Sequence, residues 1–150
     1  MIEDLSSLAL TVGSAVLLGY WFRYTCLLIL CAKTPRDYAG DLAVAHQLNF
    51  PSVQRQLHEG GPSNLDYLQA SLNRDYTLLK HLIQQGSREN TPTPVGHRIL
   101  RIDYQLMACW YSLTRRFSEQ AARRAVEEMY LVVAHLANAI GEGAIVSTCS

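Results

Sequence analysis

The residues that could do chemistry are scattered along this chain rather than gathered in one motif. The five histidines do not fall at the spacing that places two metal ligands on one helical face, and no Glu-x-x-His occurs. His135 follows Glu128 by two helical turns, and we interpret it as a surface or core histidine. The sequence therefore predicts neither a metal site nor a cofactor.

The motifs of nucleophilic and phosphate chemistry are not found in the sequence. It contains no Gly-x-Ser-x-Gly, no phosphate-binding glycine loop and no dinucleotide fingerprint. Cys109 has no basic residue one helical turn away and lies in an apolar stripe, which is typical of core packing. We therefore expect a protein without catalytic residues, and an enzyme of unknown type is the third-ranked hypothesis.

Asp103 and Trp110 are the residues best suited to a buried site. Asp103 lies among large side chains in HRILRIDYQLMACWY, where it could pair with Arg98 or Arg101, or reach toward the N-terminal helix. Trp110 lies two turns further on and could line a pocket between helices, although an aromatic core position is the commoner arrangement. A ligand-binding or sensory module with a pocket near Trp110 is the second-ranked hypothesis.

The charge balance argues against nucleic acid as a partner. Thirteen basic and thirteen acidic residues cancel, and only 17% of the 150 residues are charged. Binding to nucleic acid requires a basic face that neutralises phosphates. The densest clusters of basic residues are Arg115-Arg116 and Arg123-Arg124. We interpret them as surface charge that is balanced by Glu127 and Glu128. Anionic lipid headgroups are the alternative partner for them.

A long apolar segment precedes all of these residues. Between Leu5 and Ala32 the only charged residue is Arg23, and the run exceeds the about 20 residues that a bilayer core requires. Glu3 and Asp4 precede it and no small-x-small site follows, so we predict a retained anchor rather than a cleaved signal. The alternative is a very apolar helix buried in a larger complex.

The flanking charges predict how this anchor is oriented. No basic residue precedes it, whereas Arg23, Lys33 and Arg36 follow Phe22. The positive-inside rule then places the N-terminus outside and the C-terminal part in the cytoplasm. We expect a single-pass protein of the inner (cytoplasmic) membrane, with the lipid bilayer as its first partner.

Aromatic residues surround Arg23 and indicate a membrane boundary. Tyr20, Trp21 and Phe22 directly precede it, and aromatic side chains favour the membrane–water interface. In the favoured interpretation the span ends near Phe22, and Arg23 extends to the headgroups. In the alternative the span covers residues 11–31, and Arg23 lies inside it with an acidic or backbone partner.

Small residues recur every four positions along the same segment. Such spacing lets the backbones of two membrane helices approach closely. We therefore expect self-association or packing against another membrane protein, through a ladder formed by Ser7, Thr11, Ala15 and Gly19.

The rest of the chain shows helical periodicity and no convincing alternation of apolar and polar residues, the pattern typical of strands. Thr34-Pro35 predicts a short helix to about Leu48, and Pro51 a second one that ends before Gly60. Three long amphipathic helices follow. We expect the first to start at Ser63 or Asn64, the third to start after Ser118 as its cap, and Gly141 to end the third.

Each long helix has a predicted apolar stripe. The first is formed by Leu65, Leu68, Leu72, Tyr76, Leu79 and Ile83. The second is formed by Val95, Ile99, Ile102, Leu106, Cys109 and Leu113. The third is formed by Ala122, Val126, Met129, Val133, Leu136 and Ile140.

These elements predict an all-α protein. It comprises an N-terminal transmembrane (or very apolar) helix and a small antiparallel bundle of three long and one or two short helices. The expected divisions are an anchor with an apolar extension (1–33), short helices and linker (34–62), the bundle (63–141) and a flexible tail (142–150). The first-ranked functional hypothesis is a non-enzymatic interaction or accessory subunit of a membrane assembly.

Overall fold

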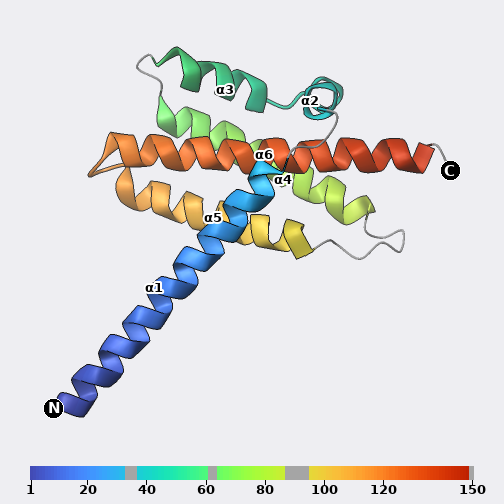
Figure 1. The fold of residues 1–150 in the computed structure, drawn as a ribbon. Coiled ribbons are helices and arrows are strands. Elements are labelled where there is room, and N and C mark those ends of the chain that lie inside the picture. The colour runs from blue at the N-terminus through green and yellow to red at the C-terminus, as the bar shows by residue number, and fades with distance from the viewer. Residues whose placement is uncertain (33–36, 61–63, 87–94, 149–150) are drawn as a thin grey trace. The chain divides into compact units, whose positions relative to one another are not determined.

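The computed structural model describes residues 1–32, 37–60, 64–86 and 95–148, with side chains described as far as residue 144. Within these residues the chain is all-helical, as predicted, and it divides into two units, Met1–Lys33 and Thr34–Ser150. The six helices are α1 (Ile2–Cys31), α2 (Ala39–His46), α3 (Phe50–Glu59), α4 (Leu65–Gly86), α5 (Val95–Thr114) and α6 (Glu119–Thr148), as Figure 1 shows.

Helix α1 makes up the described part of the first unit. It is an unbroken helix of 30 residues, about 45 Å long at 1.5 Å per residue. Its hydroxyl groups do not interrupt it, because Ser6, Thr11 and Thr25 donate hydrogen bonds of 2.8–2.9 Å to backbone carbonyls three or four residues earlier. The predicted apolar N-terminal helix is therefore confirmed, and it is long and apolar enough to cross a membrane.

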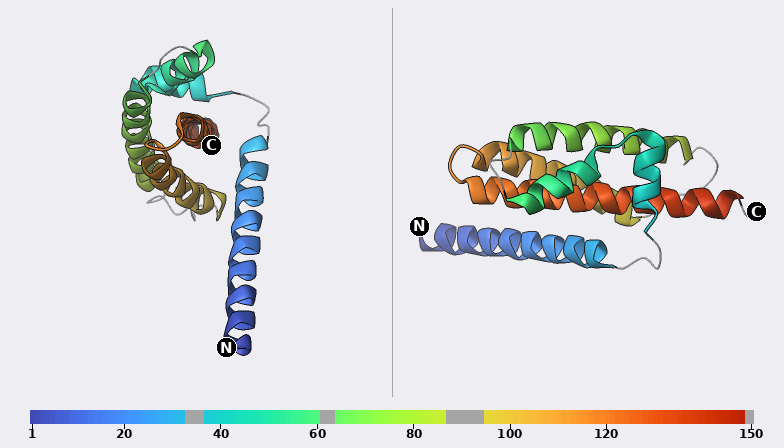
Figure 2. Two further views of the ribbon diagram at one scale, coloured as in Figure 1. Left: turned by 90° about the vertical axis from the view of Figure 1, so that its left-hand side faces the viewer. Right: turned by 90° about the horizontal axis from the view of Figure 1, so that it is seen from above.

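Helix α6 is the centre of the second unit. Helices α2, α3, α4 and α5 all pack against it, and the left view of Figure 2 shows them arranged around it. Helix α5 runs in the opposite direction to α4 and α6 (Figure 1). Three long and two short helices are present in this unit, as predicted, but four of them share α6 as their packing partner.

The predicted stripes of α4 and α6 form most of the core. In α6, Val126, Met129 and Val133 are fully buried, and in α4, Leu68 and Leu72 are fully buried. The apolar residues recur every three or four positions, so each helix presents one face to the interior. The predictions for these two helices are confirmed except at Leu65, Ile83 and Ile140, which are half-buried.

The predicted stripe of α5 is wrong. Its members are mostly exposed, and the buried residues lie on the adjacent side of the helix, as Leu100, Asp103, Tyr104, Met107, Tyr111 and Thr114. Helix α5 is apolar over two neighbouring faces, so its periodicity alone does not say which one is buried. Contacts with α4 favour the second face, because the Tyr104 ring stacks on Tyr76 at a centroid distance of 3.9 Å and an interplanar angle of 11°.

Two predicted helix caps are confirmed. The Asn64 Oδ1 accepts a hydrogen bond from the Tyr67 N–H at 3.3 Å, and the Ser118 Oγ accepts one from the Ala121 N–H at 3.3 Å. Helix α3 begins one residue before the predicted Pro51 and ends at Glu59, as predicted, and the following Gly60 has a left-handed φ of 63°. Glycine is favoured there because this conformation is strained for residues with a Cβ.

The predicted start of the first short helix is wrong. Thr34 and Pro35 lie outside the described residues, but Asp37 and Tyr38 are not helical and α2 begins only at Ala39. An Asp37 carboxylate oxygen accepts the Ala39 N–H at 3.1 Å. The Tyr38 N–H donates instead to the Asn138 side chain at 2.6 Å, which ties the start of α2 to α6.

Gly141 does not end α6, contrary to the prediction. The helix continues to Thr148, so most of residues 142–150 is helical. Gly141 is required for packing, since a Cβ at this position would lie 2.6 Å from the Tyr38 Cβ and 3.4 Å from the Tyr38 carbonyl oxygen. The segment that leads into α2 therefore crosses α6 with Tyr38 against Gly141.

We predict that Gly141→Ala destabilises the second unit by about 1–2 kcal/mol. The overlap with Tyr38 costs about 1–3 kcal/mol, and the better helix propensity of alanine returns up to about 1 kcal/mol. Gly143→Ala in the same helix is the control, because no atom lies within 4 Å of its Cβ position. Urea unfolding of the full chain in mild detergent measures the difference. Equal stability of the two variants would contradict this account of Gly141.

Candidate functional site

The predicted helix-packing ladder lies on the surface of α1. Its members Ser7, Thr11, Ala15 and Gly19 are all exposed. A Cβ added at Gly19 would meet no atom within 4 Å. The structure therefore leaves room beside the ladder for the backbone of another helix, but the packing itself stays a prediction.

The predicted membrane-boundary residues follow on the same helix. Tyr20 and Trp21 are exposed, whereas Phe22 and Arg23 are half-buried. The helix continues without a break through all four and on to Cys31. An unbroken helix is compatible with either predicted position of Arg23, so the choice between interface and span stays a prediction.

Asp103 is buried as the sequence indicated, whereas Trp110 is half-exposed. The Asp103 side chain is fully buried on α5. Within the described residues no ion pair joins it to Arg98 or Arg101, and both arginines are exposed. Neither Asp103 nor Trp110 lines either of the two clefts described below. The predicted pocket near Trp110 stays a prediction.

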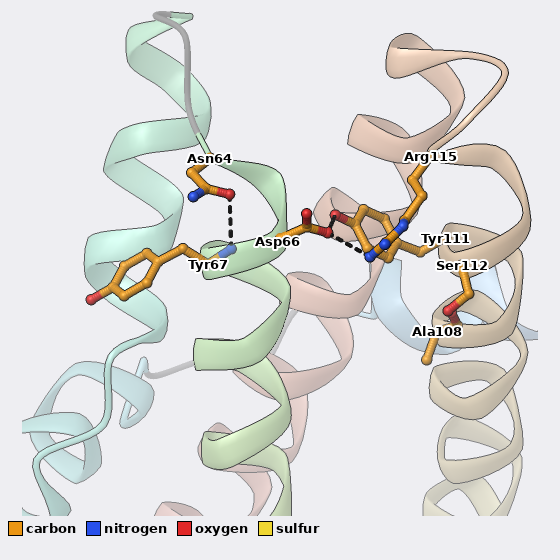
Figure 3. A network of polar contacts seen from close by, with 7 residues as sticks. All are labelled: Asn64, Asp66, Tyr67, Ala108, Tyr111, Ser112 and Arg115. Atoms are coloured by element: carbon orange, nitrogen blue, oxygen red, sulfur yellow. Dashed lines mark hydrogen bonds and ion pairs between the residues drawn. The ribbon is translucent and has the colours of Figure 1, made fainter.

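The sequence did not reveal a polar network that joins the start of α4 to the end of α5. An Asp66 carboxylate oxygen accepts hydrogen bonds from the Tyr111 hydroxyl at 2.6 Å and from the Arg115 guanidinium at 2.9 Å (Figure 3). Burial and the bond to Asp66 raise the pKa of Tyr111 to about 12, so its hydroxyl stays protonated and remains a donor at neutral pH. The network therefore holds two helices together with one carboxylate.

A cleft of about 350 Å³ opens beside this network. It is lined by Asn64, Leu65, Asp66, Tyr111, Arg115, Arg116, Glu119 and Ala122. The charge of Arg115 is already paired with Asp66, and among the described residues of the lining there is no cysteine, serine or histidine that could act as a nucleophile or base. We interpret these contacts as a helix clamp rather than as a catalytic site.

A buried carboxylate, that of Asp75, connects α4 to α3. The Asp75 side chain is completely buried. One of its carboxylate oxygens accepts hydrogen bonds from the backbone N–H groups of Asn49 and Phe50, at 2.7 Å each. These are unpaired donors at the N-terminus of α3, so Asp75 caps that helix from a neighbouring one. Burial raises the pKa of Asp75, although the two bonds oppose the shift.

The other cleft, of about 370 Å³, lies where α3 packs against α6. Its lining consists of Gln54, Leu57, His58, Glu127, Tyr130 and Leu131. At its edge Arg123 donates to the Leu57 carbonyl and pairs with Glu127 at 3.7 Å, which confirms the predicted pairing on α6. Within the part of the chain that the structure describes, no group of three His, Cys, Asp or Glu side chains is arranged to hold a metal ion.

Comparisons with protein-family models, with curated proteins and with solved structures find no significant match to this chain. The functional interpretation therefore depends on the residues themselves.

We predict that Asp66 and Tyr111 are coupled by about 1 kcal/mol. The bond to a charged acceptor would contribute more in the interior, but Asp66 is largely exposed and solvent weakens the interaction. A double-mutant cycle of Asp66→Ala and Tyr111→Phe, read from the free energy of unfolding, measures the coupling. Tyr67→Phe on α4 is the matched control, because that side chain is exposed. Strictly additive effects of the two substitutions would contradict the clamp.

Proposed function

We propose that this protein is a non-enzymatic, membrane-anchored helical protein that acts as an interaction or accessory subunit of a membrane assembly. The observation that carries the proposal is helix α1, which is 30 residues long and exposes apolar side chains on every side along residues 2–21. The second unit would then be the part that stands outside the bilayer.

The exposed side chains of α1 are too many for a helix that stays in water. They are Leu5, Leu8, Leu10, Val12, Val16, Leu17 and Leu18, together with Tyr20 and Trp21. Transfer of each large apolar side chain out of water contributes about 1.5–3 kcal/mol. A bilayer would cover all of these side chains at once, and the backbone groups that lipid cannot satisfy are already bonded within the helix.

The length of α1 also fits this proposal. About 45 Å of helix exceeds the about 30 Å of a hydrocarbon core, so the helix has residues to spare. If the core ends near Phe22, then Tyr20 and Trp21 lie at the headgroup level, where aromatic side chains are favoured. The guanidinium of Arg23 would reach the phosphates, and residues 24–31 would continue as a helix on the cytoplasmic side.

The small-residue ladder supports a role in assembly. Lipid tails are as apolar as leucine side chains, so the hydrophobic effect does not drive helices together inside a membrane. Helices therefore associate there chiefly where small residues let them approach closely. Ser7, Thr11, Ala15 and Gly19 offer such a surface, and Thr11 has its hydroxyl already bonded within the helix. A second copy of α1 or a helix of another membrane protein would pack against it.

We predict that Gly19→Leu and Ala15→Leu each reduce association in membranes at least about fivefold, since an added side chain keeps two backbones apart and such contacts contribute about 1 kcal/mol or more. Leu17→Phe adds bulk on another side of α1 and serves as the control. Chemical cross-linking of the full chain in native membranes, followed by mass analysis of the products, measures the association and identifies the partner. A chain that stays monomeric and uncross-linked before substitution would overturn the proposed role.

We predict further that the C-terminal end faces the cytoplasm. Lys33 and Arg36 follow the anchor and no basic residue precedes it, which favours an outside N-terminus. Replacing Cys26, Cys31 and Cys109 by serine leaves Cys149 as the single thiol, and a membrane-impermeant maleimide should label it only after the membrane is opened. Labelling of Cys149 from outside in intact cells would reverse the proposed orientation.

A further inference from the structure

Helix α5 has an apolar face that no described part of the second unit covers. We call it the outer face of α5 and define it by Val95, Ile102, Leu106, Cys109, Trp110 and Leu113. The exposed fractions are 71% for Val95, 54% for Ile102, 47% for Leu106, 49% for Trp110 and 60% for Leu113, and Cys109 is also exposed.

These residues form one continuous surface. Val95, Ile102, Leu106 and Leu113 are separated by steps of four or seven residues, so they lie on one side of the helix over its whole length. Helix α5 has 20 residues, which makes the face about 30 Å long. A surface of this extent differs from the isolated exposed leucines of an ordinary soluble protein and indicates an interaction site.

The exposed charged residues of α5 are all basic. Arg98 and Arg101 are exposed on α5, and Arg116 is exposed just after its end. The one acidic residue of α5, Asp103, is fully buried. Within the described residues Arg98, Arg101 and Arg116 have no ion-pair partner, whereas Arg115 is paired with Asp66. The exposed side of α5 therefore combines an apolar face with unpaired positive charge.

We propose that the outer face of α5 lies on the surface of a membrane that contains anionic lipid. The inference rests on the proposed anchoring of the chain by α1. An apolar face with tryptophan and leucine, bordered by arginine, is the pattern of helices that lie in the plane of the membrane interface. Leu106 and Leu113 enter the acyl region, Trp110 lies at the headgroups, and the arginines pair with lipid phosphates.

A second copy of this chain fits the face less well. A symmetric pair would place the outer faces of two α5 helices together. It would then bring Arg98, Arg101 and Arg116 of both copies close to one another, with no exposed acidic residue on either helix to balance them. Anionic lipid removes this repulsion, because the phosphates supply the missing negative charge.

The anchor would make weak surface binding sufficient. A helix held in the bilayer keeps the second unit near the headgroups, so α5 meets the membrane at a high effective concentration. Each arginine near an anionic surface strengthens the attachment about fivefold. The second unit would then be held in one orientation by lipid contacts.

The chain has only two tryptophans, Trp21 on α1 and Trp110 on α5, so each can be observed alone. The full chain is reconstituted into phosphatidylcholine vesicles with or without phosphatidylglycerol, and quenching by lipids with brominated acyl chains is measured. In Trp21→Phe the remaining Trp110 should have blue-shifted emission and be quenched by brominated lipid, more strongly with phosphatidylglycerol. In Trp110→Phe the remaining Trp21 reports insertion of α1.

The outcomes separate the two proposals. Quenching of both tryptophans supports the membrane face of α5. Quenching of Trp21 alone supports the anchor but overturns the membrane contact of α5. Quenching by acrylamide dissolved in the water then shows whether Trp110 faces water or is covered by protein, such as a second copy of the chain. If neither tryptophan is quenched by brominated lipid, α1 is not in the bilayer and the proposed anchoring fails as well.

A pair of charge variants tests the lipid contacts. Arg98→Gln with Arg101→Gln should lower the ratio of inserted to free Trp110 about thirtyfold in phosphatidylglycerol vesicles, and should leave only the smaller effect of that lipid that Arg116 contributes. Arg55→Gln with Arg124→Gln is the matched control, because both arginines are exposed on other helices. Circular dichroism checks that both variants keep their helices. Equal loss in the two variants would overturn the assignment of the charge effect to α5.

Discussion

Burial of helix α6 is the constraint on which the second unit depends. Beyond its main stripe, Ala125, Val132 and Ala137 are also buried, so α6 is covered over more than one side. A single amphipathic partner covers only one stripe, and a helix buried this widely requires several. Helices α2, α3, α4 and α5 supply that cover. The close crossing at Gly141 follows from the same demand, because the chain before α2 can approach α6 only where no side chain intervenes.

Two carboxylates of α4, the buried Asp75 and the largely exposed Asp66, serve this arrangement. The Asp75 carboxylate accepts hydrogen bonds from the two backbone N–H groups at the start of α3. The Asp66 carboxylate accepts hydrogen bonds from Tyr111, near the end of α5, and from Arg115, directly after it. Each carboxylate therefore fixes one end of a helix against α4. Packing of apolar stripes leaves a helix free to slide or tilt, whereas a charged hydrogen bond at a helix end has one geometry.

The sequence predicted those features that arise within one helix. The α4 and α6 stripes, the Asn64 and Ser118 caps and the long N-terminal helix all follow from local spacing. The α5 face, the role of Gly141 and the Asp66–Tyr111 bond could not be predicted in this way, because each depends on a residue far along the chain. For α5 the local pattern was ambiguous, since Ile102 and Leu106 are as apolar as Leu100 and Met107. In the structure the face that turns inward packs on α6 and carries Tyr104, whose ring stacks on Tyr76.

The exposed apolar face of α5 supports the proposed role at a membrane. The side chains of Leu106, Trp110 and Leu113 are each about half exposed, so burying the rest of each would contribute about half of the 1.5–3 kcal/mol that full burial gives. Burial of the exposed leucines of α1 would contribute in the same way. A chain that kept both surfaces in water would have a strong tendency to aggregate. One bilayer offers cover for both, with its hydrocarbon core for α1 and its interface for α5, which is why we connect the two surfaces through lipid.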